Sequence, residues 1–500
     1  MSVIFQELSL SLYAFHLRNE LTQNNKADED ANKIWELCKT LSEKLNIKEL
    51  QYFADFLKQK GDEIGYPPTE EYPKSGYLEL LDKPENRIEF SIPNSEPEIN
   101  GEVYAYQIHD TYALDIGLRF TSDKIDLENL SKLNPEKIFR PDSIKAELKK
   151  NFLGQTLLLF AKPSEDIEDD QELAKKCLTS LFSNSDIEYF QIDIAKELSS
   201  GYLLGSPIFE YDNGQEIPGK NLHILIWINR NTVTDDLEKK GDYYPLLINL
   251  LCCRNKILFS YSESRKSYEK AKGLYQKLKE YVNDIKQLPT EPNDKLNKLK
   301  KRLNDLMYDV FDYSRHLRDL KIQHTSINTN TTNYKLFLNK LQKISVKESV
   351  KEKDDLQFMQ DFLSHAENKL AEQIKVDLSY LNTGKELYGE MLNFIRGIVE
   401  IDQAKLEAEK VQLEAEKAER DKSFERNIQV IGVTLGSTAI VSGIASDSIA
   451  GHIDKPFKLN PKYPVHPMIS SFVGSFSVTI VFLLAILWLW NKREGNSKNS

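Results

Sequence analysis

Residues 214–220 have the spacing of a phosphate-binding loop. They read Gly-Gln-Glu-Ile-Pro-Gly-Lys, which matches the G-x-x-x-x-G-K pattern. Asn221 stands where such loops carry the Ser or Thr that binds magnesium. The apolar run Leu222–Ile228 then predicts a strand, whereas the pattern needs a helix whose amides face the phosphate. We therefore interpret the segment as a hairpin loop between two strands.

The other side chains capable of chemistry form no known constellation. The eight histidines are scattered, and His316 and His324 lie too far apart along one helix to share a metal ion. The four cysteines contain no CxxC pair, so we expect reduced core thiols. Since no catalytic residue, cofactor motif or metal-ligand set is identifiable, we expect that the protein is not an enzyme, and any metal site is unknown.

Length and charge limit the remaining classes of function. A chain of 500 residues is too long for one ordinary core, so several units are expected. The formal net charge of -11 argues against direct binding of nucleic acid. The N-terminus lacks the basic start and apolar core of a signal peptide, so residues 1–420 should stay in the compartment where they are made.

The last part of the chain differs in composition from the rest. Met468–Trp490 contains no charged residue, and about 20 residues of apolar helix cross a bilayer. Aromatic and then basic residues follow one another at its end, as expected at a membrane surface. A second uncharged stretch, 427–446, precedes it. The sequence therefore predicts two transmembrane helices that form a hairpin over residues 428–490.

Helical spacing gives the first of these spans two different faces. One face carries glycines that would let another helix approach closely, namely Gly432, Gly436 and Gly443. The opposite face carries hydroxyl groups from Thr434, Thr438 and Ser442. These hydroxyls either bond back to their own helix or line a polar path between subunits, with Asp447 near its outer mouth. The residues alone do not choose between the two readings.

Charged residues around the spans predict the orientation. Eight lysine and arginine residues flank the spans on their terminal sides, and three lie in the loop between them. This bias favours both termini in the cytoplasm. We thus expect a multi-pass protein of the cell (inner) membrane with two spans.

A long helix is expected to lead into the first span. The sequence has no proline between Pro292 and Pro456, and Leu356–Lys422 has a helical pattern almost throughout. Small residues in alternating steps of four and three predict a coiled-coil seam over Ala404, Ala408, Val411, Ala415 and Ala418. Residues 382–384, Asn-Thr-Gly, are the expected break.

Upstream of the long helix, apolar stripes predict three further helices at 262–287, 294–323 and 334–344. The Asn- and Thr-rich stretch 325–333 is interpreted as a loop.

The N-terminal region mixes both periodicities. Helices are predicted at 5–21, 31–45, 47–58 and 164–182, and strands at 87–92, 103–108, 112–120, 156–160, 187–192, 208–211 and 222–228. In residues 112–120 the apolar residues alternate with polar ones, which is typical of a half-buried strand, and 109–111 would form its hairpin turn.

These patterns predict an α+β (or α/β) N-terminal domain over 1–240, a helical layer over 241–352 and a stalk helix over 353–427. The transmembrane hairpin over 428–490 and a cytoplasmic tail over 491–500 would follow.

This order of parts resembles the CorA-type divalent-cation transporters. In that family the first span ends with Gly-Met-Asn, whereas this chain reads Gly443-Ile444-Ala445-Ser446-Asp447 at the corresponding place. The resemblance implies a divergent member that assembles as a pentamer, with first spans lining a pore and cytosolic domains controlling it. It also implies a nucleotide or an ion as the ligand of the cytosolic domain.

The expected function is therefore an oligomeric membrane channel, transporter or ligand-gated membrane effector. The alternative is a non-conducting membrane tether or scaffold that presents a cytosolic protein-binding domain. The expected partners are the membrane and further copies of the same chain.

Overall fold

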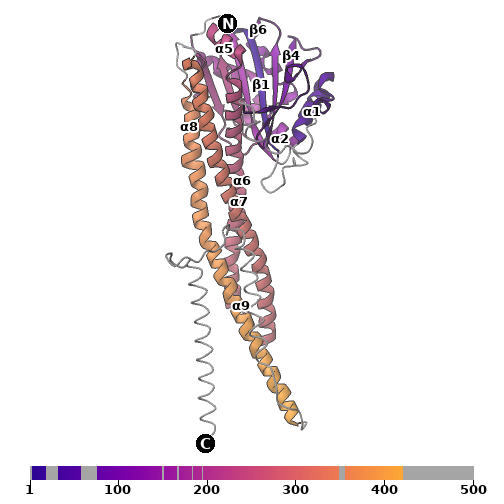
Figure 1. Ribbon diagram of the computed structural model, residues 1–500, viewed down its shortest axis with the longest axis vertical. Helices are drawn as coiled ribbons and strands as arrows, with labels where there is room; N and C mark the ends of the chain where they lie inside the picture. Colours follow the sequence, from indigo (N-terminus) through magenta and orange to yellow (C-terminus); the bar gives the residue numbers. More distant parts are fainter. Residues whose placement is uncertain are drawn as a thin grey trace, which may run out of the picture. The chain divides into compact units, whose positions relative to one another are not determined.

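The computed structural model describes residues 3–18, 32–57, 76–148, 151–165, 168–182, 184–193, 195–347 and 355–420. Contacts divide the chain into two units, Met1–Lys410 and Val411–Ser500. In the first unit a mixed β-sheet is followed by long helices (Figure 1). This confirms the coarse prediction of a mixed α and β region followed by a helical one. The predicted hairpin over 428–490 lies outside the described residues.

One mixed sheet of ten strands forms within the described part of the chain. Its strand order is β2-β4-β5-β1-β7-β10-β9-β8, with β3 beside β4 and β6 beside β1. Neighbouring strands are antiparallel except for the pair formed by β10 and β7. The bounds are β1 Ile4–Leu17, β2 Leu78–Glu79, β3 Arg87–Ser91, β4 Ile99–Ile108, β5 Thr111–Phe120, β6 Ile125–Asp126, β7 Phe152–Pro163, β8 Ser199–Leu203, β9 Ser206–Asp212 and β10 His223–Ile228.

The central strand β1 corrects the prediction of a helix over 5–21. Leu8, Leu10 and Leu12 are buried on one face of the sheet, while Tyr13 and Phe15 belong to the apolar cluster on the other face. This alternation has the period of two that a strand requires. Because β1 pairs with β5 on one side and β7 on the other, both of its edges are covered.

Helices cover both faces of the sheet. On one face, α1 (Lys33–Leu45), α2 (Pro141–Leu148) and α3 (Asp170–Leu181) contribute apolar side chains to the first core. On the other face, α5 (Thr232–Lys240) and the first turns of α6 (Tyr244–Lys286) pack against the sheet. Two apolar layers therefore sandwich the strands, as expected for a sheet buried on both sides.

Two further predictions in the N-terminal region are wrong. Residues 187–192 were expected to form a strand, but α4 (Asn184–Tyr189) is helical. The buried carboxylate of Asp186 binds Arg140 with an Nη1–Oδ1 distance of 2.9 Å, which holds α4 beside the start of α2. The helix expected over 47–58 is replaced by two short 3₁₀ turns, Lys48–Leu50 and Phe53–Phe56, which bury Leu50 and Phe53.

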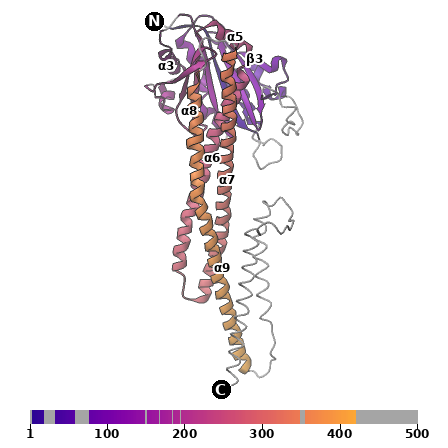
Figure 2. The ribbon, with the colours of Figure 1, turned by 60° about the vertical axis from the view of Figure 1, so that its left-hand side comes forward.

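The helical part begins with α6, and α7 (Pro292–Lys347) then packs along it. After a gap come α8 (Gln357–His365), one π-helical turn (Ala366–Ala371) and α9 (Glu372–Arg420). Figure 2 shows α6, α7 and α9 running side by side within the first unit. Their shared core includes Leu278, Leu306, Leu320, Ile374 and Ile395.

Helix α7 passes through the stretch 325–333 that was expected to be a loop. Asn and Thr are weak helix formers because their side chains compete with the backbone for hydrogen bonds. Here the competing groups bond to their own helix: the Asn330 amide donates to the Ser326 carbonyl at 2.8 Å, and the Thr331 hydroxyl donates to the Asn328 carbonyl at 2.9 Å. Burial of Ile327 and Tyr334 then anchors the helix against its neighbours.

Helix α9 likewise continues through residues 382–384, where a break was expected. At Gly384, α9 lies close to Tyr275 of α6 and Tyr313 of α7. Tyr313 of α7 donates a hydrogen bond of 2.6 Å to the Leu381 carbonyl of α9, and Tyr388 of α9 donates one of 2.6 Å to the Leu274 carbonyl of α6. The glycine thus serves packing between helices and does not end the helix.

Replacing Gly384 with alanine should lower the free energy of unfolding by about 1–3 kcal/mol, because the new methyl group overpacks the interface. Its Cβ would collide with the Tyr313 hydroxyl and lie 2.7 Å from Tyr275 Cδ2. Gly389→Ala is the matched control, since a Cβ there meets nothing within 4 Å in the described part of the chain. That change should stabilise the protein by up to about 1 kcal/mol. Urea unfolding of Gly384→Ala and Gly389→Ala measures both changes in the free energy of unfolding. Equal changes would contradict the packing role of Gly384.

Candidate ligand-binding pocket

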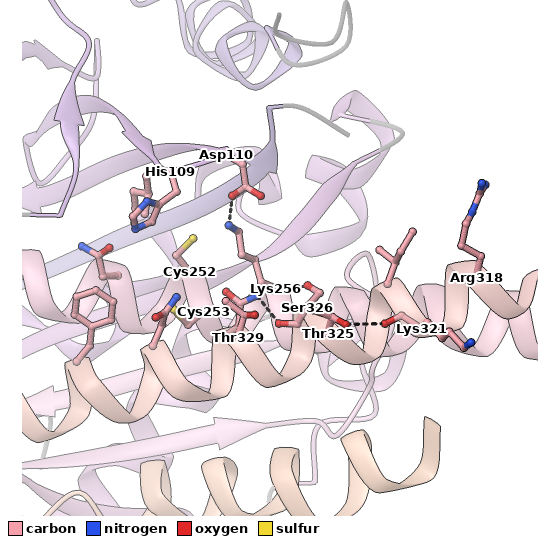
Figure 3. A pocket seen from close by; sticks show the side chains of 16 residues that line it. His109, Asp110, Cys252, Cys253, Lys256, Arg318, Lys321, Thr325, Ser326 and Thr329 are labelled. Carbon is pink, nitrogen blue, oxygen red and sulfur yellow. Dashed lines mark hydrogen bonds and ion pairs between the residues drawn. The ribbon is translucent and has the colours of Figure 1, made fainter. Parts of the chain in front are cut away.

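A pocket of about 520 Å³ opens where the sheet meets helices α6 and α7 (Figure 3). We call it the sheet–hairpin pocket, after the sheet and the helical hairpin formed by α6 and α7. The turn between β4 and β5 provides one wall, α6 the second and a long face of α7 the third. Its lining residues are Ile108, His109, Asp110, Asn249, Cys252, Cys253, Lys256, Arg318, Lys321, Ile322, Thr325, Ser326, Thr329, Asn330, Asn333 and Phe337.

The β4–β5 turn was predicted at 109–111, and the structure confirms it. His109 adopts a left-handed conformation with φ of 53°, as tight hairpin turns require. This turn directs the Asp110 carboxylate toward α6, where it forms an ion pair with the Lys256 ammonium. The turn, α6 and the pocket are therefore joined by one buried contact.

The Asp110–Lys256 pair is charged at neutral pH. Burial lowers the pKa of Lys256, but the neighbouring Asp110 carboxylate outweighs that effect and the net shift is upward. Burial raises the pKa of Asp110, yet attraction to Lys256 brings it below its ordinary value. Burial and the Lys256 charge both lower the pKa of His109, so its imidazole is neutral at pH 7. The pair adds no net charge to the pocket.

Two further cations give the pocket a positive end. Arg318 and Lys321 are one turn apart on α7, and their side chains extend in different directions from the helix (Figure 3). Arg318 lies near the Asp319 carboxylate, but at an Nη2–Oδ1 distance of 4.0 Å, and its side chain is 65% exposed, so the contact is weak. The pocket therefore has an excess of positive charge from these side chains.

Hydroxyl and amide groups extend from this positive end along α7. Thr325, Thr329 and Asn333 follow one another in steps of four and hence share one face of the helix. Within the described residues, the side chains of Thr329 and Asn333 have no hydrogen-bond partner in the protein, whereas Ser326 shares a hydrogen bond of 2.8 Å with Ser260 of α6. The face can donate and accept hydrogen bonds along its length.

The opposite end of the pocket is apolar. Ile108 is buried, Phe337 is half-buried, and the thiols of Cys252 and Cys253 contribute to the wall. Burial raises the pKa of Cys252 to about 11, so this thiol is protonated at neutral pH and is a poor nucleophile. All four cysteines are buried and unpaired, in agreement with the expected core thiols. The pocket has the groups for binding and lacks an activated nucleophile.

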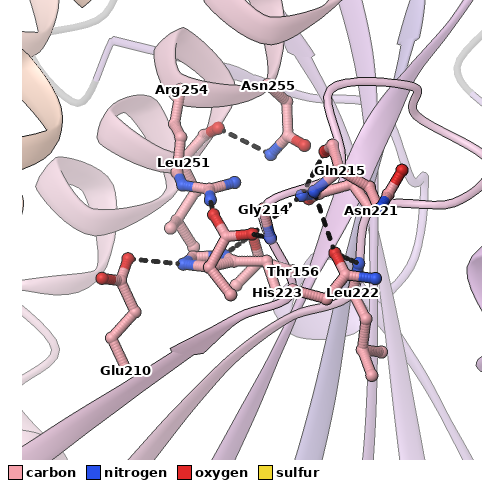
Figure 4. A network of polar contacts seen from close by, with 12 residues as sticks. Thr156, Glu210, Gly214, Gln215, Asn221, Leu222, His223, Leu251, Arg254 and Asn255 are labelled. Carbon is pink, nitrogen blue, oxygen red and sulfur yellow. Dashed lines mark hydrogen bonds and ion pairs between the residues drawn. The ribbon is translucent and has the colours of Figure 1, made fainter. Parts of the chain in front are cut away.

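A second polar cluster lies inside the fold, between β7, β9, β10 and α6 (Figure 4). The His223 imidazole contacts the Thr156 hydroxyl at 2.9 Å and the Glu210 carboxylate at 3.0 Å. This order of groups resembles a catalytic triad, but Thr156 and His223 are fully buried. Because no substrate can reach the hydroxyl, the cluster is structural.

The same cluster explains the loop that resembled a phosphate-binding motif. Residues 213–222 connect β9 to β10, which confirms the interpretation as a hairpin loop. The Asp212 carboxylate accepts hydrogen bonds from the Gly214 amide at 2.8 Å and the Asn221 side chain at 3.1 Å (Figure 4). Arg254 of α6 forms an ion pair with the same carboxylate and stacks on Phe362 of α8. These contacts hold the β9–β10 loop against α6 and α8.

The residues that the sequence singled out near its C-terminal end lie outside the described residues. They are the expected path-lining residues Thr434, Thr438, Ser442 and Asp447 and the expected packing residues Gly432, Gly436 and Gly443. Among the histidines, His316 lies beside Asp319 and His324 beside Asn328. In the part that the structure describes, no group of three or more His, Cys, Asp or Glu side chains could hold a metal ion.

The expected function is corrected by the described helices. A membrane channel, transporter or ligand-gated membrane effector, with a membrane tether as the alternative, requires a helix that can cross a bilayer. Over the described ranges up to residue 420, no helix is both long and apolar enough to do so. Helices α6, α7 and α9 have the length, but charged residues recur along each of them.

Sequence reasoning missed the sheet–hairpin pocket. Its α7 wall falls within the stretch that was interpreted as a loop, although the steps of four between Thr325, Thr329 and Asn333 were a readable helical signal. No family model matches the chain, and no curated protein does so either. The resemblance to CorA-type transporters therefore stays a prediction.

Proposed function

We propose that this protein is a sensor that binds a small phosphate-bearing molecule, such as a mononucleotide, in the sheet–hairpin pocket. The observation that supports this best is the pocket's position, because one ligand would contact the β4–β5 turn, α6 and α7 at once. Its volume of about 520 Å³ falls within the range of roughly 300–1,000 Å³ that small-molecule sites occupy.

The chemistry of the two ends favours an amphiphilic anion. Arg318 and Lys321 would hold the phosphate through charge-assisted hydrogen bonds, while Phe337 and Ile108 would cover a flat apolar group such as a base. Thr329 and Asn333 lie between the ends, where a sugar or another polar linker would meet them. An apolar ligand would leave these cations without a role, and a bare anion would leave the apolar end empty.

Binding would be transmitted through α7. Its residues Tyr334 and Leu338 pack against the sheet cluster, and its earlier residues Tyr313 and Leu320 belong to the core shared with α9. A ligand that joins α7 to the β4–β5 turn would stabilise the packing of the sheet on the long helices. A sensor needs a ligand that stabilises one arrangement of its parts more than another.

The direct test is isothermal titration of the full-length chain with AMP, ATP, adenosine and inorganic phosphate. The nucleotides should bind more tightly than adenosine or phosphate alone, and their affinity should fall as salt rises. Arg318→Gln/Lys321→Gln should weaken nucleotide binding by about tenfold to a hundredfold, since each charge-assisted contact contributes about 1.5 kcal/mol or more. No binding by any of the four probes would overturn the proposal.

Lys300→Gln/Lys301→Gln provides the matched control. These two exposed lysines lie on the same helix, away from the pocket, and their replacement makes the same change in net charge. Binding should remain at the wild-type level. Equal losses of affinity in the two double variants would mean that nucleotide binding depends only on the overall charge of the protein. Slower amide exchange in residues 249–256 and 322–337 on binding would support the sensor role.

A further inference from the structure

Helix α9 carries large apolar side chains on the face turned away from α6 and α7. We call this set the outer stripe: Val376, Tyr380, Leu387, Phe394 and Ile401. Their exposed fractions range from 37% for Leu387 to 76% for Tyr380. None of them belongs to an apolar cluster of the described residues, whereas Leu381, Tyr388 and Ile395 on the inner face do.

The outer stripe has the spacing of a coiled coil. Tyr380, Leu387, Phe394 and Ile401 follow one another every seven residues, and Val376 precedes them by four. A period of seven keeps one face of a helix in contact with a second helix over its whole length. A face that served only as a solvated surface would have no reason to keep that period.

The alanine-rich seam predicted near the end of α9 has the same register. Ala404 and Ala408 lie three and seven residues after Ile401, so they continue the alternating steps of the stripe. The combined surface from residue 376 to 408 is about 48 Å long at about 1.5 Å per residue. The intervening positions, Thr383, Glu390 and Gly397, are small, polar or charged, so the contact rests chiefly on the large residues, and Glu390 would face its own copy and weaken it.

We propose that the outer stripe is an interface with a second copy of this chain, packed parallel and in register. An identical helix matches its period, and the inner face of α9 is already covered by its own α6 and α7. In the parallel arrangement Glu400 of one copy faces Lys405 of the other, which is a complementary pair. An antiparallel arrangement would place Glu386, Glu400 and Glu407 on the side where they meet one another, with like charges opposed.

The position of the contact is tested by cysteine cross-linking of the full-length chain. Thr383→Cys and Ala404→Cys lie on the stripe, where a parallel pair brings equivalent Cα atoms to the roughly 4.4–6.8 Å that a disulfide needs. Their neighbours Asn382→Cys and Gln403→Cys lie off it and are the controls. Mild oxidation should give covalent dimers from the first two variants and little from the controls. Equal yields from all four variants, or none from the stripe variants, would overturn the interface.

Native mass spectrometry tests the association itself. The wild-type chain should have a mass that is a multiple of 57.7 kDa. Phe394→Glu/Ile401→Glu should reduce it to the single chain by placing charges in the seam. Tyr308→Glu/Phe311→Glu alters two even more exposed apolar residues of α7 and should leave the assembly intact. A wild-type mass of one chain would overturn the proposal, as would dissociation in both double variants.

Discussion

Asp212→Ala is expected to lower the free energy of unfolding by about 3 kcal/mol, because it leaves a buried guanidinium without its counter-ion. The Arg254 side chain is 2% exposed, and its partner Asp212 is 25% exposed, which places the effect at the lower end of the range for buried pairs. The Nε and Nη1 atoms of Arg254 have no hydrogen-bond partner in the described structure, so little remains to compensate the charge.

Removing both charges should cost less than removing one. In Arg254→Met/Asp212→Ala the guanidinium is replaced by an apolar side chain that can still pack on Phe362, so about 2 kcal/mol should be recovered. Glu43→Ala, which breaks an exposed pair with Lys39, should leave the unfolding midpoint nearly unchanged. Urea unfolding followed by tryptophan fluorescence measures all three variants. A double variant as unstable as Asp212→Ala would contradict this account.

The contribution of Asp115 to the stability of the protein should fall as pH rises from about 4 to about 7, and Asp115→Asn should remove that contribution. Burial is the main cause that raises the pKa of Asp115 to about 7; a hydrogen bond of 2.6 Å from the Tyr244 hydroxyl partly opposes it, and Glu102 adds to it. Between the unfolded and folded pKa values the folded state binds the extra proton, so deprotonation costs folding free energy. Below pH 4 the penalty is absent, and above pH 7 it is complete.

The free energy of unfolding should change by about 4 kcal/mol at most, because the pKa of Asp115 rises from its ordinary value of 3.8 to about 7 on folding. The difference in unfolding free energy between Asp115→Asn and the wild type should grow from near zero at pH 4 toward that value at pH 8. Tyr244→Phe removes the donor that favours the charged carboxylate and should move the midpoint of the pH profile upward. A difference that does not change with pH would show that Asp115 does not titrate in this window.

Local sequence patterns predicted the strands in which apolar and polar residues alternate clearly. In β5 the alternation of Leu114, Ile116 and Leu118 with polar residues predicted a strand, and the structure confirms it. The alternation also suggested that Asp115 faces water, as Arg119 does. Tyr244 of α6 covers Asp115 on that face, and the position of a residue 129 positions away is not encoded in local periodicity.

Tertiary packing also determined the structure of a segment for which local propensity gave the wrong prediction. The stretch 325–333 is rich in loop-forming residues, yet buried Ile327 and Tyr334 hold it in α7. Without that helix the sequence could not bring Lys321 and Asn333 to one pocket. The pocket is assembled from three distant segments, and no spacing along the chain connects them.

The central place of β1 has a consequence for biosynthesis. Strand β1 is synthesised before its partners β5, β6 and β7, which end at Phe120, Asp126 and Pro163. At about 5–20 residues per second, the roughly 150 residues up to the end of β7 take on the order of ten to thirty seconds to make. Both edges of the segment Leu8–Phe15 lack a partner until β5 is made, and the edge that pairs with β7 lacks one until the end of that interval. A chaperone that holds nascent chains would therefore act here first, and loss of β1 would divide the sheet at its middle.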